Sequence, residues 1–277
     1  MEVEMRANAK INLALDVLAD RQDGYHEVDM VIQEIALADQ LCIENGRGGF
    51  VLTCDDPDLA LDQKNTIYQA WLALKDRAED PSVVVELEKR IPKEAGLGGG
   101  SSDGAAMLKG LNKLWELDLT DEELEAIGAQ IGSDVPFFIK GGTQRAQGRG
   151  EKLTPLRSWH GRHLVLVNPG LGLSTAYVYA QVKANGTIPV DRLVHAINAS
   201  TDRGLDHMAN QLETVALRLQ PKLHQIKKEL TDLGAQKALV SGSGPTVFGL
   251  FADREEALHA ERILKSAYPF VCVSQTL

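Results

Sequence analysis

The feature that most constrains the fold is a glycine-rich segment in the first half of the chain, residues 92–103. It reads Pro-Lys-Glu-Ala-Gly-Leu-Gly-Gly-Gly-Ser-Ser-Asp, and four of the five positions from Gly96 to Gly100 are glycine. Apolar residues that alternate over 83–87 predict a strand before the segment, and apolar residues at helical spacing over 105–114 predict a helix after it. The segment therefore connects a strand to a helix.

A glycine-rich connection between a strand and a helix is typical of an anion-binding site. Glycine lets the backbone approach a ligand without obstruction by a Cβ atom, and the first N–H groups of a helix supply donors and a favourable dipole. Ser101 and Ser102 add hydroxyl groups. A plain connecting turn is the alternative, but four glycines carry an entropic cost that a simple turn does not need. We therefore predict a phosphate site.

Three common phosphate-binding motifs do not fit this segment. A P-loop requires a lysine directly after its last glycine, and Ser101 follows Gly100 here. Ser101 also occupies the third glycine position of a dinucleotide-binding fingerprint that would begin at Gly96. The catalytic-loop and Asp-Phe-Gly motifs of protein kinases are missing from the sequence. The site must belong to another class of nucleotide-binding protein.

The rest of the chain reads as an α+β protein. The period-two pattern over 11–17 predicts a half-buried strand, and 163–167 predicts a further strand. The tight turn Ser-Gly-Ser-Gly-Pro at 241–245 lies between two more apolar strands. Because 277 residues suffice for two modest domains, we predict one domain at 1–158, with the glycine loop, and a second at 159–277.

Composition and charge restrict the partners. The formal net charge is -10, with 39 acidic and 29 basic side chains, so a nucleic acid would be repelled overall. The three cysteines have no metal-ligand spacing and suit a reducing compartment. No apolar stretch approaches the roughly 20 residues that span a bilayer. We expect a cytoplasmic protein without a nucleic-acid or membrane partner, and the sequence leaves open whether it is a monomer or a homodimer.

Three motifs, in this order along the chain, resemble those of the GHMP kinases, named for galactokinase, homoserine kinase, mevalonate kinase and phosphomevalonate kinase. They are Ala-Lys-Ile-Asn-Leu at 9–13, the glycine-rich segment 92–103, and Ser-Gly-Ser-Gly-Pro at 241–245. The resemblance spans nearly the whole chain. It implies a two-domain α+β GHMP kinase fold with the active site in the interdomain cleft. The expected activity is the transfer of a phosphoryl group from ATP to an alcohol.

The resemblance places ATP along the glycine loop. The residues it implies for the nucleotide are Pro92, Gly96, Leu97, Gly98, Gly99, Gly100, Ser101 and Ser102. Asn65 and Asn112 are expected on the adenine side, although either could equally be a helix cap or a surface amide. Mg²⁺ is expected to arrive with ATP because the phosphates must be neutralised. Ser102 is one candidate metal ligand, and the sequence has no carboxylate cluster to assign, so the ligands stay open.

Two residues are expected to carry the chemistry, because transfer to an alcohol needs a group that receives the hydroxyl proton. Asp134 lies in Gly-Ser-Asp-Val-Pro, where it could instead cap a helix. Lys10 lies on the strand face opposite Ile11, where a solvated lysine would be the simplest interpretation. In the family, the matching aspartate is the proposed base and the matching lysine lies beside it. The resemblance therefore assigns catalytic roles to Asp134 and Lys10.

Two further motifs, Asp-Gly-Tyr-His at 23–26 and Gly-Ser-Asp-Val-Pro-Phe-Phe at 132–138, narrow the resemblance to a branch that phosphorylates a cytidine diphosphate alcohol. That substrate belongs to non-mevalonate isoprenoid synthesis, and the product would be its 2-phosphate. The residues implied for the substrate are Asn12, Tyr25, His26, Thr175, Tyr179, Gly242 and Ser243. Tyr177 is an alternative to Tyr179, and the Tyr25–His26 pair could simply close a hairpin.

Two rival functions remain open. The first is a GHMP kinase for another alcohol, such as homoserine or a mevalonate derivative. The second is a catalytically silent relative that binds nucleotide as a regulatory module, and the presence of Lys10 and Asp134 argues against it. The sequence departs from the related motif at Gly104, where alanine usually follows the aspartate, and we expect this change to loosen the start of the helix.

Overall fold

The structure is a computed structural model, described here for residues 2–200 and 202–277, with backbone only at 202 and 203. The chain forms two compact units. Unit 1 comprises the chain up to Ala9, Leu37–Ile91 and Gly98–Gly141, and unit 2 comprises Lys10–Ala36, Pro92–Leu97 and Gly142–Leu277. The units are interleaved along the sequence, and residue 158 lies inside unit 2. The division into domains 1–158 and 159–277 stays a prediction.

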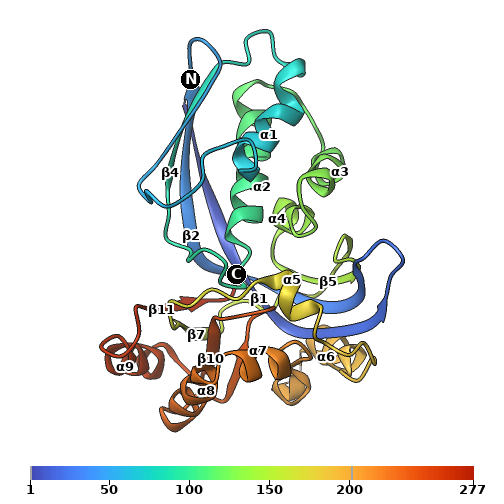
Figure 1. Ribbon diagram of the computed structural model, residues 1–277, viewed down its shortest axis with the longest axis vertical. Helices are drawn as coiled ribbons and strands as arrows, with labels where there is room; N and C mark the ends of the chain where they lie inside the picture. The colour runs from blue at the N-terminus through green and yellow to red at the C-terminus, as the bar shows by residue number, and fades with distance from the viewer. Residues whose placement is uncertain (1, 201) are drawn as a thin grey trace. The chain divides into compact units, whose positions relative to one another are not determined.

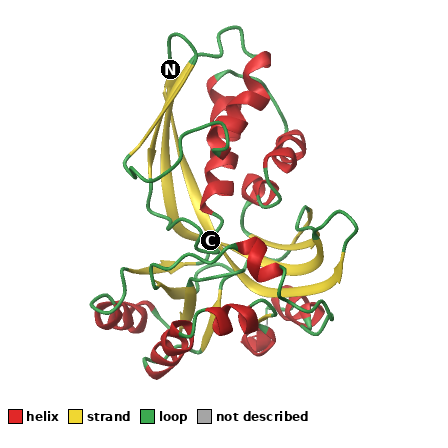
Figure 2. Cartoon of the chain, viewed as in Figure 1, coloured by secondary structure: helices red, strands yellow, loops and turns green. Residues whose placement is uncertain are grey.

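Unit 1 contains part of a sheet and four α-helices. The strands of this sheet path follow the order β3-β4-β2-β1, with β1 (Glu2–Asp20), β2 (His26–Asn45), β3 (Phe50–Cys54) and β4 (Val83–Glu88). Strands β1 and β2 continue into unit 2. The helical elements are α1 (Thr66–Leu74), η1 (Lys75–Arg77), α2 (Gly99–Leu114), α3 (Asp121–Ile131) and α4 (Val135–Lys140). Figure 1 shows α1 to α4 on one side of these strands, and Figure 2 separates this helical layer from the sheet by colour.

Unit 2 extends the same sheet and adds a second one. Strand β5 (Thr143–Gly148) pairs with β2 and with β6 (Lys152–Pro155), and β8 (Ala209–Asn210) runs parallel to β1. The second sheet is antiparallel, in the order β11 (Phe270–Gln275), β7 (His163–Asn168), β10 (Val247–Phe251) and β9 (Lys237–Val240). Helices α8 (Lys222–Asp232) and α9 (Arg254–Leu264) pack against it (Figure 1). The remaining helical elements are α5 (Thr175–Tyr179), α6 (Val190–Asn198), η2 (Asp202–His207) and α7 (Glu213–Leu219).

The helix after the glycine loop begins earlier than the sequence predicted. Helix α2 starts at Gly99, six positions before Ala105, so two glycines and both serines form its first turn. Gly98 precedes it at φ 74°, in the left-handed region that favours glycine. The poor helix propensity of glycine hid this start. Packing explains why position 104 is glycine and not alanine, because a Cβ atom there would lie only 3.1 Å from Thr66 Cβ.

Strand β1 corrects a second expectation. The alternation over 11–17 predicted one buried face, but every residue from Ala9 to Val17 is buried. Asn12 is only 1 % exposed, like its apolar neighbours. Part of the reason lies in unit 2, where the backbone at Gly242 approaches the face that carries Asn12. Burial by a segment that is distant in the sequence does not change the local hydrophobic pattern, so the pattern could not predict it.

Within residues 2–200 and 202–277, no helix has both the length and the apolar character needed to cross a membrane. The three cysteines, Cys42, Cys54 and Cys272, are half-buried free thiols.

Candidate active site

The first half of the glycine loop, from the half-buried Pro92 onward, is held by the turn at 241–245 within unit 2. Gly96 has φ 74°, and a Cβ atom on it would lie 2.1 Å from the carbonyl oxygen of Ser241. The Ser241 hydroxyl donates a hydrogen bond to the Gly96 carbonyl over 2.9 Å. A backbone bond from Thr246 N to the Ala95 carbonyl adds a second link. Only glycine fits at position 96, because both the conformation and the space exclude a side chain.

Lys10 points into this loop and is not a solvated surface lysine. Its side chain is buried, and Nζ donates to Asn12 Oδ1 over 2.7 Å and to the Gly96 carbonyl over 3.1 Å. Its backbone N–H donates to the Leu97 carbonyl over 2.9 Å. A Cβ atom on Gly242 would lie 3.4 Å from Lys10 Nζ and 3.2 Å from Asn12 Oδ1. Three residues predicted from distant motifs, Lys10, Asn12 and Gly242, thus meet in unit 2.

Asn210 supports this arrangement, and sequence reasoning missed it. Its side chain is buried, and Nδ2 donates to the carbonyls of Val240, over 2.8 Å, and Gly242, over 2.7 Å. Its Oδ1 accepts from the backbone N–H of Leu212 over 2.9 Å. The side-chain amide of Asn210 therefore holds both the end of β9 and the turn beside Lys10. A single asparagine outside any motif or period gave no signal in the sequence.

The second half of the loop lies in unit 1 and supplies the start of α2. Its first N–H groups have no partner within the helix itself, and they are the donors that anions use at helix starts. A Cβ atom on Gly100 would meet nothing within 4 Å, and Gly100 is exposed. Ser102 is 2 % exposed, whereas Ser101 is half-buried. The backbone at Gly100 therefore forms the open part of the loop.

Asp134 precedes α4 at the N-cap position, but its side chain makes no capping hydrogen bond. The capping alternative therefore does not account for its carboxylate. Asp134 is half-buried, and its turn adjoins the start of α2, since a Cβ atom on Gly132 would lie 3.8 Å from Ser101 Oγ. Asp134 belongs to unit 1 and Lys10 to unit 2, so their convergence at one site stays a prediction.

The predicted substrate residues of unit 2 form two groups. The rings of His26 and Tyr179 lie 5.2 Å apart and are tilted by 40°, and His26 Nε2 lies 3.3 Å from Asp20 Oδ1. Tyr177 is 56 % exposed, so of the two tyrosines it is Tyr179 that accompanies His26. Tyr25 is also exposed, and its ring stacks under the guanidinium of Arg149, 4.7 Å from the ring centre. The rings of Tyr25 and His26 thus contact different side chains, and their roles toward the substrate stay predictions.

The second group consists of Thr175, on helix α5, and Ser243, in the turn that faces the glycine loop. Thr175 is the first residue of α5, and the Thr175 hydroxyl lies 2.9 Å from the hydroxyl of Ser243. The Ser243 side chain is buried in the turn at 241–245. Since Tyr179 ends the same helix, α5 connects the aromatic group of His26 with the Ser243 turn.

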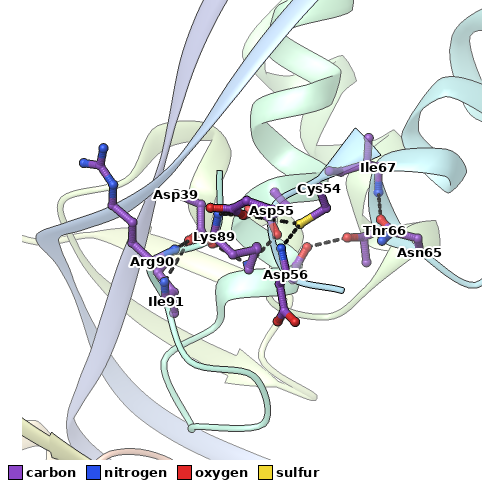
Figure 3. Close-up of polar contacts among 12 residues, drawn as sticks. Asp39, Cys54, Asp55, Asp56, Asn65, Thr66, Ile67, Lys89, Arg90 and Ile91 are labelled. Carbon is purple, nitrogen blue, oxygen red and sulfur yellow. Dashed lines mark hydrogen bonds and ion pairs between the residues drawn. The ribbon is translucent and has the colours of Figure 1, made fainter. Parts of the chain in front are cut away.

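Asn65 takes the capping role that the sequence left open, whereas Asn112 is neither a helix cap nor a surface amide. Asn65 caps α1, with Oδ1 accepting from Ile67 N over 2.9 Å (Figure 3) and Nδ2 donating to the Ala60 carbonyl over 2.9 Å. Asn112 bonds both the N–H and the carbonyl of Leu119 over 3.0 Å. Their contact with adenine stays a prediction. Over the described parts of the chain, no group of three or more His, Cys, Asp or Glu side chains is arranged to hold a metal ion.

Comparison with protein families and characterised sequences gives a consistent result. The family model for the GHMP kinases N terminal domain matches residues 65–142, and that for the GHMP kinases C terminal matches residues 193–269. A protein of Acetivibrio thermocellus named 4-diphosphocytidyl-2-C-methyl-D-erythritol kinase is 43% identical, with 99% of each chain covered. A protein of the same name from Caldanaerobacter subterraneus is 41% identical, with 100% of this chain and 98% of the relative covered.

Solved structures agree with the sequence relatives. A crystal structure of 4-(cytidine 5'-diphospho)-2C-methyl-D-erythritol kinase superposes with a TM-score of 0.86 at 34% identity, over 99% of both chains. A homoserine kinase from Cytophaga hutchinsonii superposes with a TM-score of 0.76 at 18% identity, over 99% of this chain and 94% of the other. The second likeness concerns the fold alone.

Proposed function

Because the chain belongs to the GHMP kinase family, we propose that it transfers the terminal phosphoryl group of ATP to the 2-hydroxyl of 4-diphosphocytidyl-2-C-methyl-D-erythritol. The products are ADP and the 2-phosphate, in the non-mevalonate synthesis of isoprenoid precursors. The observation that carries this proposal is the identity of 41–46% to kinases of that name, together with the meeting of Lys10, Asn12 and the Gly242 turn at the glycine loop.

The reaction follows from the chemistry of the named groups. The Asp134 carboxylate accepts the proton of the 2-hydroxyl, and the oxygen attacks the terminal phosphorus of ATP while the bond to the bridging oxygen of ADP breaks. The Lys10 ammonium, a donor on a buried stem, balances the charge of the carboxylate and of the phosphates. The N–H groups from Gly98 to Ser101 hold the phosphate oxygens at the start of α2, whereas the Ser102 N–H donates to the Gly98 carbonyl.

A Mg²⁺ ion bound with ATP would neutralise part of the phosphate charge. Such an ion is usually held by few protein ligands in addition to the phosphates, which is compatible with a site that lacks a carboxylate cluster among the described residues. We assign the hydroxyl of Ser102, on the first turn of α2, as a ligand of this Mg²⁺ ion.

The remaining parts of the proposal concern the substrate and the surroundings. His26, Tyr179 and Thr175 receive the cytosine end of the substrate, and Tyr25 acts with them through its exposed face. The matched segments lie on either side of residue 158, which supports an N-terminal domain at 1–158 with the ATP-binding glycine loop and a C-terminal domain at 159–277 that contributes to substrate binding. A cytoplasmic location, and a monomer or a homodimer, stay predictions.

An ADP-release assay with a panel of alcohols tests the proposed activity. We expect the cytidylyl alcohol to support release at least about 100-fold faster than homoserine or mevalonate, because a site built to bond a nucleobase discriminates strongly against substrates that lack it. Phosphorus NMR of the product should identify a new phosphomonoester at the 2-position. Preference for homoserine or mevalonate would indicate another GHMP kinase activity, and ATP binding without release would indicate a silent relative.

A further inference from the structure

A cluster of three buried charges lies behind the glycine loop, entirely within unit 1. Lys89 follows the end of β4, and its ammonium contacts the carboxylates of Asp39, on β2, and Asp103, on α2, the latter over 2.8 Å. The three side chains are between 0% and 7% exposed. One carboxylate oxygen of Asp103 is buried and has no hydrogen-bond partner. The cluster thus has a lysine between two acids, with one acid incompletely satisfied.

The cluster is attached to both ends of the loop. On the entry side, the second oxygen of Asp39 accepts the backbone N–H groups of Arg90 and of Ile91, the latter over 2.8 Å (Figure 3). On the exit side, Asp103 lies on the first turns of α2, which begins at Gly99. Asp39 therefore fixes the chain that enters the loop, and Lys89 connects it to the helix that leaves the loop.

The two ends are also in direct contact. A Cβ atom on Gly99 would lie 3.0 Å from Ile91 Cγ2 and 3.5 Å from Lys89 Nζ. The first turn of α2 is held from a second side by Thr66, whose hydroxyl donates to the Gly100 carbonyl (Figure 3). The residues that enter and leave the loop are therefore closely packed, and the loop itself is the segment between them.

Stability alone does not explain these charges. Burial raises the pKa of Asp103 to about 7, against the opposing charge of Lys89, which indicates a costly environment for the carboxylate. Burial also works to lower the pKa of Lys89, but the charges of Asp103 and Asp39 together raise it. Apolar side chains of the same volume often stabilise a fold as well as a buried ion cluster does. What the cluster adds is a defined geometry.

We propose that Lys89, Asp39 and Asp103 are positioning residues that hold the two ends of the glycine loop in the conformation that receives the triphosphate of ATP. This inference rests on the proposed function, because it assumes that the loop binds a nucleotide. It assigns none of the three residues to contact with the reacting atoms. Their effect is on how often the loop amides adopt the arrangement that binds phosphate.

Two variants separate positioning from simple electrostatics. Lys89→Met removes a positive charge near the phosphates, so it would weaken ATP binding by charge alone. Asp103→Asn can only remove negative charge, so by charge alone it would strengthen ATP binding or leave it unchanged. If the cluster positions the loop, both variants weaken ATP binding. Lys89→Met removes the contact between Lys89 and α2, and Asp103→Asn leaves it with a neutral acceptor. For Asp103→Asn, charge alone predicts no loss of ATP binding, whereas positioning predicts a loss. This variant is therefore the decisive one.

The experiment measures the affinity of the folded protein for ATP and for adenosine, which lacks the phosphates. We expect Asp103→Asn to lower the affinity for ATP by about three- to tenfold, as replacing a charge-assisted bond by a neutral one implies. Affinity for adenosine should stay within about twofold of the parent value. Lys140→Met is the matched control, since Lys140 also contacts two acids, Glu122 and Glu125, but near the surface.

Each outcome decides the proposal. Unchanged or stronger ATP binding by folded Asp103→Asn overturns it, and so does an equal loss for ATP and adenosine, which would indicate general damage. If Lys89→Met does not fold, because it leaves two buried acids without a cation, Asp103→Asn decides alone. A parent protein that binds ATP but phosphorylates no alcohol defeats the proposed function and leaves this binding test in force. A parent that binds no ATP defeats both.

Discussion

Replacing Asp134 with asparagine is expected to lower kcat by about 10²–10⁴-fold, the contribution that a positioned general base makes. Asparagine has nearly the same shape but cannot accept the hydroxyl proton at neutral pH. The fold should tolerate the change because the two side chains have nearly the same size and no capping hydrogen bond to α4 is lost. Steady-state kinetics with the cytidylyl alcohol, together with calorimetric titration of ATP, measure the effect.

The binding measurement is the internal control for this variant. ATP affinity should stay within about threefold of the parent, because a lost transition-state interaction lowers kcat and not ground-state binding. Glu122→Gln, a similar change at an exposed acid of the neighbouring helix α3, should behave like the parent in both measurements. Turnover of Asp134→Asn at the parent rate would show that another group takes the proton.

Substituting alanine at Gly96 is expected to destabilise the protein by at least about 3 kcal/mol and to abolish measurable ATP binding. The added Cβ atom would lie 2.1 Å from the Ser241 carbonyl oxygen, so the loop or the turn at 241–245 must move. The positive φ of 74° adds a cost of about 1–2 kcal/mol for any residue with a side chain. Thermal unfolding and ATP titration measure the two effects.

Gly142→Ala is the matched control for the backbone cost. Gly142 has a similar φ of 69°, and a Cβ atom there would meet nothing within 4 Å. This variant should lose only the roughly 1–2 kcal/mol of left-handed strain and should bind ATP as the parent does. Equal losses in the two variants would mean that the contact between Gly96 and Ser241 does not constrain the loop.

Several features of the fold could be predicted because their signals are local. The family resemblance, the α+β class and the kinase activity are confirmed by the matched family models and the relatives. Thr120 and Glu123 form a capping box that begins α3, and a threonine followed three positions later by glutamate is a local sequence signal of a helix start. The expected strands at 83–87 and 163–167 correspond to β4 and β7. Each of these depends on neighbours in sequence or on a motif that carries its own chemistry.

Other features depend on contacts between distant segments. The period of 11–17 could not reveal that Asn12 is covered by the Gly242 turn. Asn210 holds the turn through two carbonyls that lie 30 and 32 residues away in the sequence. Lys89 looks like an ordinary charged residue after a strand, and its burial between Asp39 and Asp103 arises from three separate elements. The positioning residues act through such long-range contacts. Local sequence patterns do not show these contacts, so the residues could not be predicted.

The most direct test of the account is a crystal structure with a non-hydrolysable ATP analogue and the cytidylyl alcohol bound together. We expect the phosphates to accept hydrogen bonds from the amides from Gly98 to Ser101, and the 2-hydroxyl to lie about 3–3.5 Å from the terminal phosphorus. Asp134 should contact that hydroxyl, with Lys10 next to it. A triphosphate bound away from the glycine loop, or a 2-hydroxyl that neither Asp134 nor Lys10 reaches, would contradict the account.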